Sequence, residues 1–221
     1  MLVLASNSPR RKQLLALGGW TFSVLPVEID EQPISGESPE EYVLRLAEGK
    51  AQVAARQAPP DALIIAADTT VVDQGQILGK PADSLEAEVM LRRLRGRTHQ
   101  VHTALCIQRL QDGALHSEIC TTDVSMRNYS EEEMLAYIAS GDPLDKAGAY
   151  AIQHIAFDPV ESLQGCYTNV VGLPLCRVMQ MLAKFGVSPE VELPLACLHT
   201  LEGCSERREC SITPEVLARQ F

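Results

Sequence analysis

Apolar residues follow two different periods along this chain, and the alternation between the two periods predicts its elements. Residues 2–5 and 63–67 are short, fully apolar runs, which are typical of strands buried on both faces. Elsewhere apolar residues recur at helical spacing, and most of these stretches open with a serine cap or with a proline. The predicted helices lie within residues 8–18, 38–57, 84–96, 130–141 and 173–186.

The segments between the helices and turn signals predict the remaining strands. We expect these at residues 21–27, 98–110, 115–127 and 149–153, with a tight hairpin at 70–78 and an irregular connection at 154–168. In the helix at 84–96, Leu85, Val89 and Leu94 are expected to point inward. Because helices and strands alternate around an inserted hairpin, the predicted fold class is α/β with a mixed sheet and flanking helices.

Residues 187–221 differ in character from the rest of the chain. Proline, glutamate and cysteine become more frequent and the apolar periodicity weakens. We therefore expect one domain over residues 1–186 and an appended tail. Within the tail, a zinc site of three thiols and one imidazole is chemically possible, although the spacing lacks the close cysteine pairs of known zinc motifs. A packing segment or a flexible end is the alternative. The candidate ligands are Cys197, His199, Cys204 and Cys210.

Composition narrows the class of ligand. The formal net charge is −10, which disfavours binding of duplex nucleic acid but leaves room for a small anion held by a local basic cluster and a metal. No apolar run approaches the roughly 18 residues that span a bilayer. The opening apolar run precedes the first basic residues, which is the reverse of a secretory signal, so a cytoplasmic protein with no membrane partner is expected.

Two segments could bind phosphate or activate water. After the first strand, Ser6-Asn7-Ser8 leads into Pro9-Arg10-Arg11, so a helix begins with exposed N–H groups and two cations. Helix N-termini attract anions, whereas cations are unfavourable there without a ligand. The alternative is a solvated basic turn. Asp68 follows a buried strand, where open α/β sheets place ligands, although an aspartate capping a turn would look the same.

Weaker signals lie farther along. Lys80 stands between Gly79 and Pro81 and could pair with phosphate or lie on a surface loop. Gln153 ends a segment of small and charged residues, and its amide could read the edge of a base or simply be exposed. The chain has no Gly-x4-Gly-Lys-Ser/Thr run, so a P-loop nucleotidase is excluded.

Taken in order, SNSPRR, AADT, GKPAD, DKAGAYAIQ and NVVGLPL resemble the motifs of the Maf family of nucleoside triphosphate pyrophosphatases over residues 2–186. The resemblance implies a two-lobed α/β fold with a deep cleft, similar to inosine-triphosphatase-like enzymes. It also implies a nucleoside triphosphate substrate, a divalent cation such as Mg²⁺ or Mn²⁺, and a homodimer.

Residue roles follow from the same resemblance. Asp68 matches the family's proton acceptor, and Glu31, Lys50 and Lys80 match its other charged cleft residues, with Glu31 and Asp68 able to hold the metal. Ser8 and Arg10 fall in the phosphate-binding turn.

Three further positions correspond to those that separate the subgroups of the family: Arg11, Thr69 and Gln153. Their combination resembles the subgroup that acts on dTTP and UTP rather than the one that acts on 7-methyl-GTP.

The chain departs from the family pattern at two positions. His154 replaces a glycine and could narrow the base pocket, and Cys166 replaces a serine. The resemblance also implies an association with inhibition of septum formation, so a non-catalytic or dual-role regulator of septum formation is an alternative. A pyrophosphatase for a different modified nucleotide is the rival enzyme. The charged residues at positions 31, 50, 68 and 80 favour catalysis.

Overall fold

The computed structural model describes residues 1–189, so the candidate zinc ligands of the tail lie outside the described residues. A mixed seven-stranded sheet in the order β2-β1-β3-β5-β6-β7 forms the centre, and β4 pairs with β3. Strand β1 is parallel to β2 and β3, and all other pairs are antiparallel. The predicted α/β class is confirmed. The strands are β1 (Leu2–Ala5), β2 (Phe22–Val24), β3 (Leu63–Asp73), β4 (Gln76–Leu78), β5 (Thr98–Arg109), β6 (Leu115–Met126) and β7 (Val160–Gln164).

The helices begin where the caps predicted them. Ser8 and Ser38 accept backbone N–H bonds at the starts of the first two helices, and Ser130 forms a capping box with Glu133. The α-helices are α1 (Pro9–Ala16), α2 (Pro39–Ala55), α3 (Ser84–Leu94), α4 (Glu131–Ala139), α5 (Tyr167–Val171) and α6 (Leu175–Lys184). Two short 3-10 turns, η1 (Asp142–Asp145) and η2 (Ala147–Ala149), follow α4.

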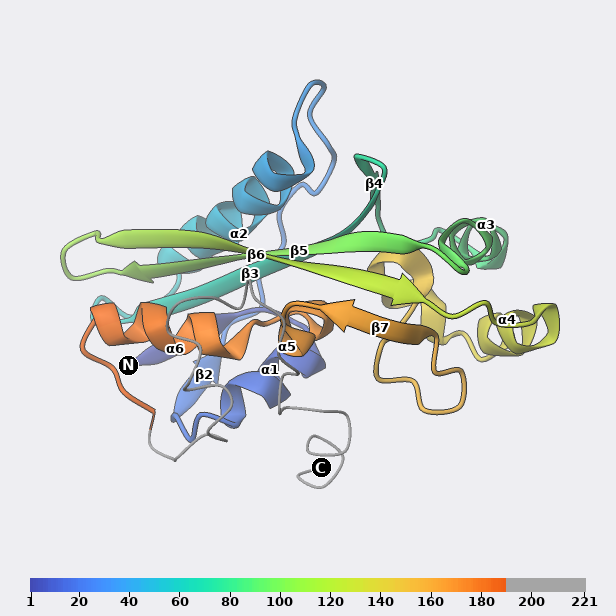
Figure 1. Cartoon of the computed structure of the whole chain (residues 1–221). Coiled ribbons are helices and arrows are strands. Elements are labelled where there is room, and N and C mark those ends of the chain that lie inside the picture. Colours follow the sequence, from blue (N-terminus) through green and yellow to red (C-terminus); the bar gives the residue numbers. More distant parts are fainter. Residues whose placement is uncertain (190–221) are drawn as a thin grey trace.

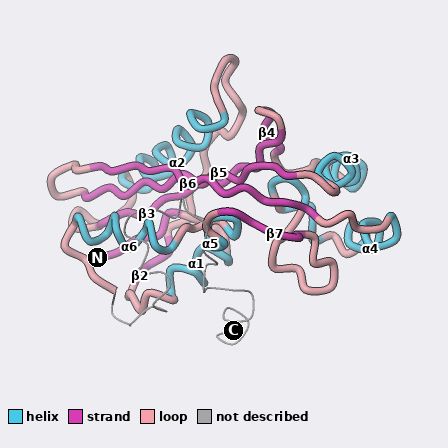
Figure 2. The backbone as a smooth tube through the Cα atoms, in the orientation of Figure 1, coloured by secondary structure: helices cyan, strands magenta, loops and turns pink. Residues whose placement is uncertain are grey.

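Helices cover both faces of the sheet (Figure 1). Helix α2 crosses one face, α1, α5 and α6 lie against the other, and α3 and α4 pack at one end, as the tube in Figure 2 also shows. The two faces follow from strand alternation. In β1, Leu2 and Leu4 join the core beside α1 and α6, whereas Val3 and Ala5 join the core under α2.

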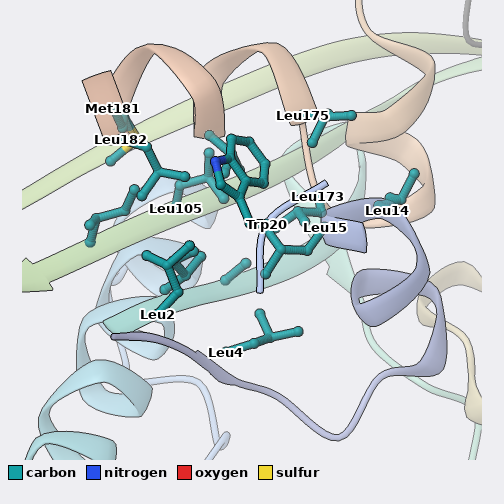
Figure 3. Packing of buried hydrophobic residues seen from close by; sticks show 14 of the residues in the cluster. Leu2, Leu4, Leu14, Leu15, Trp20, Leu105, Leu173, Leu175, Met181 and Leu182 are labelled. Carbon is teal, nitrogen blue, oxygen red and sulfur yellow. The ribbon is translucent and has the colours of Figure 1, made fainter. Parts of the chain in front are cut away.

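Trp20 is a central residue of the core beside α1 and α6. Figure 3 shows its ring among Leu105 of β5, Leu173 and residues of α6. The indole Nε1 donates to the carbonyl oxygen of Ser188 at 2.8 Å, which ties the end of the described chain to this core. A Cβ at Gly18 would overlap the Trp20 ring, so the ring requires glycine there.

Three sequence predictions are wrong in detail. Residues 149–153 are not a strand, because the left-handed residues of η2 turn the chain where Gly148 packs closely against Val71. The expected irregular connection instead contains β7, an edge strand whose largely exposed residues lack an apolar alternation. In α3, Leu85 and Val89 are 74% and 65% exposed. The inward stripe uses Ala87, Met90, Leu91 and Leu94, which have equally good helical spacing.

The hairpin prediction at residues 70–78 is confirmed. Gln74 and Gly75 both have positive φ, as a two-residue turn between β3 and β4 requires. Within residues 1–189, no helix has the length and apolar character needed to cross a membrane.

Candidate active site

One cavity of about 950 Å³ is lined by all nine residues that the sequence predicted for the nucleotide site. It opens beside the start of α1, between the chain after β2, the middle of β3 and the loops after β4 and η2. A volume of this size suits a nucleotide-sized ligand. The predicted residues in its lining are Ser8, Arg10, Arg11, Glu31, Lys50, Asp68, Thr69, Lys80 and Gln153.

Two carboxylates and one ammonium form the charged centre of this cavity. Lys50 Nζ lies 2.6 Å from Asp68 Oδ1 and 2.7 Å from Glu31 Oε1. Lys50 and Asp68 are 8% and 7% exposed, whereas the Glu31 carboxylate is much more open to water. The centre therefore holds one buried ion pair and a second carboxylate at its mouth.

Secondary-structure periods explain why these groups meet. In β3, alternation puts Asp68 on the same side as Ile64 and Ala66, which is the side that α2 covers. In α2, Lys50 follows Leu46 and Ala47 on the stripe that faces the sheet. Lys50 and Asp68 therefore each continue an apolar face, and they meet where the packed faces of α2 and β3 reach the cavity.

Burial and neighbouring charges determine whether Glu31 and Tyr42, at the mouth of the cavity, are ionised. Burial would raise the pKa of Glu31, but the hydrogen bond and charge of Lys50, with the charges of Lys80 and Arg11, hold this pKa below its ordinary value. Tyr42 donates its hydroxyl to the Glu31 carbonyl at 2.9 Å. Burial, with the negative charges of Asp68 and Glu31, raises the pKa of Tyr42 to about 12. Glu31 is therefore ionised and Tyr42 protonated at neutral pH.

The turn before α1 lines the cavity. Ser8 caps the helix by accepting from Arg11 N at 3.4 Å, and its own N–H donates to Ser6 Oγ at 3.1 Å. No acidic side chain occupies the first turn of α1. Arg10 Nη1 reaches Asp145 Oδ2 at 3.5 Å across the cavity. The helix N-terminus and Arg10 together give a concentration of positive potential suited to phosphate.

Arg11 turns in a different direction from Arg10. Its Nε donates to the Gly172 carbonyl at 2.8 Å, and its Nη2 donates to Thr69 Oγ1 at 3.0 Å. Burial lowers the pKa of the guanidinium below its usual range, and the charge of Asp68 acts against this shift. Arg11 and Thr69 are therefore a hydrogen-bonded pair in the cavity lining, and Arg11 is also held by the Gly172 carbonyl.

The two departures from the family pattern have structural accounts. His154 is absent from the cavity lining, because its ring packs edge-on against Tyr137 at 4.6 Å and its Nδ1 accepts from Phe157 N. It therefore does not narrow the cavity beside Gln153 as feared. Cys166 is buried, with Sγ 3.2 Å from Thr168 Oγ1, so the thiol occupies a packing position.

Sequence reasoning missed Lys146, which lines the cavity at 8% exposure. Its Nζ donates to Asp145 Oδ1 at 2.6 Å and to Asp142 Oδ1 at 2.9 Å, and Asp142 also accepts from the Tyr137 hydroxyl. The close spacing of two aspartates and a lysine in the DPLDK segment was the available signal. Without the third dimension it did not distinguish an exposed loop from a cavity wall.

Comparison with known proteins identifies the family. The model of the family "Maf-like protein" matches residues 1–185. A protein of Dehalococcoides mccartyi named dTTP/UTP pyrophosphatase is 44% identical over 190 residues, which cover 86% of this chain and 84% of that protein. Proteins of the same name from Citrifermentans bemidjiense and Geobacter sp. are 48% and 47% identical, and both alignments cover 84% of this chain and 95% of the relative.

Among solved structures, the Ham1 protein of Staphylococcus aureus matches 59% of this chain and 74% of its own, at 18% identity and a TM-score of 0.42. With the family model matching nearly all of residues 1–189 and these relatives well above 40% identity, the chain belongs to the Maf-like protein family.

Proposed function

We propose that this chain is a nucleoside triphosphate pyrophosphatase that hydrolyses dTTP and UTP to the monophosphate and pyrophosphate. One observation carries the proposal: a single cavity brings a cationic helix start together with the Lys50–Asp68–Glu31 centre. Hydrolysis of a triphosphate needs positive charge along the phosphates and a base near the α-phosphorus. The names of relatives at 44–48% identity support the same reaction.

The phosphates are expected to lie along the cationic wall. The N–H groups at the start of α1, Arg10 and Lys80 would receive the phosphate oxygens, with Ser8 fixing the turn. Arg10 is held by Asp145 at 3.5 Å, a partly exposed pair that a triphosphate with its greater charge would displace. Binding is thus an exchange of a weak ion pair for a stronger one.

Asp68 is the proposed proton acceptor. Its carboxylate lies in the cavity at 2.6 Å from the Lys50 ammonium, where it could take a proton from the attacking water. Lys50 donates to one oxygen of Asp68, so the second oxygen remains as an acceptor. The burial of the pair also fixes the direction of the carboxylate, which a general base requires.

The donors present fit a divalent cation that is shared with the substrate. The oxygens of Glu31 and Asp68 converge on one ammonium at 2.7 and 2.6 Å. Residues 1–189 contain no group of three or more Asp, Glu, His or Cys side chains that could hold a metal alone. Mg²⁺ is commonly held by one or two carboxylates plus substrate phosphates. We infer that Glu31 and Asp68 would hold Mg²⁺ or Mn²⁺, which would neutralise phosphate charge and polarise the phosphoryl group.

Base selection is assigned to other residues of the cavity lining. Gln153 can donate and accept together, which matches the imide edge that uracil and thymine share. Arg11 and Thr69 stand as a fixed pair in the same cavity. We propose that these three residues favour pyrimidines with a 4-carbonyl group.

We propose a homodimer in the cytoplasm, with residues 1–186 as the catalytic unit. Light scattering coupled to size-exclusion chromatography tests the dimer, which a single species at the mass of one 24.2 kDa chain would contradict.

The proposed activity is tested with the purified full chain and Mg²⁺. UTP, dTTP, CTP, dCTP, ATP and GTP are supplied separately, and monophosphate and pyrophosphate are quantified by anion-exchange chromatography. We expect UTP and dTTP to be cleaved fastest, with equal amounts of the two products. Faster cleavage of purine triphosphates, or release of orthophosphate in place of pyrophosphate, would overturn the proposal.

A further inference from the structure

A buried chain of hydrogen bonds continues from the Arg11–Thr69 pair into the core. Thr69 of β3 and Thr103 of β5 are partners in the antiparallel register, and their hydroxyl oxygens lie 2.9 Å apart. Thr103 is 0% exposed, and its Oγ1 lies 3.0 Å from the carbonyl oxygen of Asn169 in α5. These hydrogen bonds therefore link the cavity lining to α5 through Thr103, which does not itself line the cavity.

The direction of each hydrogen bond in this chain is fixed by its end. A carbonyl oxygen can only accept, so the one hydroxyl proton of Thr103 goes to Asn169. Thr103 must therefore accept from Thr69, whose own proton is then committed. Thr69 Oγ1 in turn accepts from Arg11 Nη2. Donation runs in one direction, from Arg11 through Thr69 and Thr103 to α5.

Helix α5 and the glycine that follows it hold both ends of this series of hydrogen bonds. Asn169 Nδ2 donates to Val101 O at 3.0 Å and to Thr122 Oγ1 at 2.9 Å, which fastens α5 to β5 and β6. The Gly172 carbonyl at the other end of α5 accepts from Arg11 Nε. Gly172 has φ +120, and a Cβ there would lie 3.4 Å from Thr69 Oγ1, so glycine lets the backbone approach the pair closely.

The directions of these hydrogen bonds determine which donors of Arg11 and Thr69 remain for a base. Because the Thr69 proton is used internally, Thr69 cannot donate to a ligand, and the remaining donors of the pair are the N–H groups of Arg11. Such donors match the 4-carbonyl of uracil or thymine. The 4-amino group of cytosine would oppose them donor to donor, and an unpaired polar group in a site is a strong cause of discrimination.

We propose that Thr103 is a positioning residue for base selection: it takes the Thr69 proton and holds the Arg11–Thr69 pair, so that the N–H donors of Arg11 are offered to the base and uracil and thymine nucleotides are preferred over cytosine nucleotides. The proposal rests on the proposed dTTP and UTP activity. It predicts that a hydroxyl outside the cavity governs the choice of base while leaving the charged centre around Asp68 intact.

The test compares kcat and KM for UTP and CTP in the wild type, Thr103→Val and Thr103→Ser. Valine keeps the volume and removes the hydroxyl, so Thr69 loses its acceptor while Asn169 O keeps its bond from Gly172 N. Loss of one such bond is expected to raise KM for UTP about tenfold, with kcat and the CTP parameters little changed. Serine restores the hydroxyl and should restore discrimination. If Thr103→Val does not fold, Thr103→Cys, with its weak hydrogen bonding, should lose discrimination in the same direction.

Tyr129→Phe provides the matched control. It also removes a buried hydroxyl that donates to a backbone carbonyl, that of Leu91 at 2.7 Å, but it lies in the core beside α3 and α4. It should lower the melting temperature without changing the UTP-to-CTP ratio. A wild type that discriminates, with Thr103→Val discriminating equally, overturns this inference alone. A wild type that cleaves UTP and CTP equally overturns the proposed specificity and this inference together.

Discussion

Replacing Lys50 with methionine removes the one cation between Glu31 and Asp68 while keeping the length of the side chain that packs in α2. Asp68 is then a 7% exposed carboxylate without its ammonium partner. Breaking a buried pair by removing one partner costs about 3–5 kcal/mol. Glu31 can turn its more exposed carboxylate toward water, so we expect about 3 kcal/mol, the lower end of that range. For a chain of this size the melting temperature would fall by about 6–12 °C.

Added Mg²⁺ then tests the metal site through stability rather than activity. If Glu31 and Asp68 bind the cation, Lys50→Met frees both carboxylates for it, so Mg²⁺ should raise the melting temperature of the variant more than that of the wild type. A ligand at 100 times its Kd stabilises the folded state by about 2.7 kcal/mol, enough to recover most of the loss. The measurement is thermal unfolding by circular dichroism with Mg²⁺ and with EDTA.

Two further variants make this result decisive. Lys184→Met removes an exposed ammonium that pairs with Glu118 at 2.8 Å, and a surface pair of this kind should change stability by less than about 1 kcal/mol. Adding Asp68→Asn to Lys50→Met should abolish the extra Mg²⁺ response. An equal response in the wild type, Lys50→Met and the double variant would refute the reasoning that these carboxylates hold the cation.

Two other predictions concern the fold, and a third concerns residues 190–221. Burial lowers the pKa of His99 from 6.5 to about 4. As the pH falls, His99 is therefore protonated in the unfolded chain before it is protonated in the folded one, so stability is lost between about pH 6.5 and pH 4, by up to about 3 kcal/mol. Urea unfolding of wild type and His99→Gln at pH 7 and pH 4 should show a smaller loss in the variant, and equal losses would contradict the assignment. Gly18→Ala forces a methyl group into the Trp20 ring and should lower stability by about 1–3 kcal/mol, seen as a lower urea midpoint; an unchanged midpoint would refute the packing account. Removal of residues 190–221 should leave UTP cleavage and zinc content unchanged, since the matched family region ends at residue 185, and loss of either would assign the tail a role.

The sequence predicted those features that local chemistry determines. The caps at Ser8 and Ser38 set two helix starts, and the apolar run at residues 63–67 identified the central strand. The expectation that Asp68 follows this strand is wrong, because β3 continues through Asp68 to Asp73. The motif order then placed residues from distant parts of the chain in one site, and the cavity brings them together. The contact between Lys50 and Asp68 follows from the periods of helix α2 and strand β3, because each residue continues the apolar face of its element.

What the sequence could not supply depends on tertiary packing. The segment at 149–153 has the composition of a strand, but Gly148 packs closely on Val71, and Gly148 and Ala149 turn the backbone there with positive φ. Strand β7 pairs at the sheet edge with little apolar signal. Thr103 looks like any polar residue in a strand until its register partner, Thr69, is known.

The central claim is tested most directly by comparing the wild type with Asp68→Asn, using UTP and dTTP with Mg²⁺ and measuring pyrophosphate release. Asparagine keeps the shape of the side chain, and Lys50 retains Glu31 as a partner at 2.7 Å, so the variant should fold, which its melting curve verifies. We predict that the wild type releases pyrophosphate and monophosphate in equal amounts and that Asp68→Asn is slower by about 10²–10⁴-fold. A folded Asp68→Asn variant that retains the full rate would contradict the account.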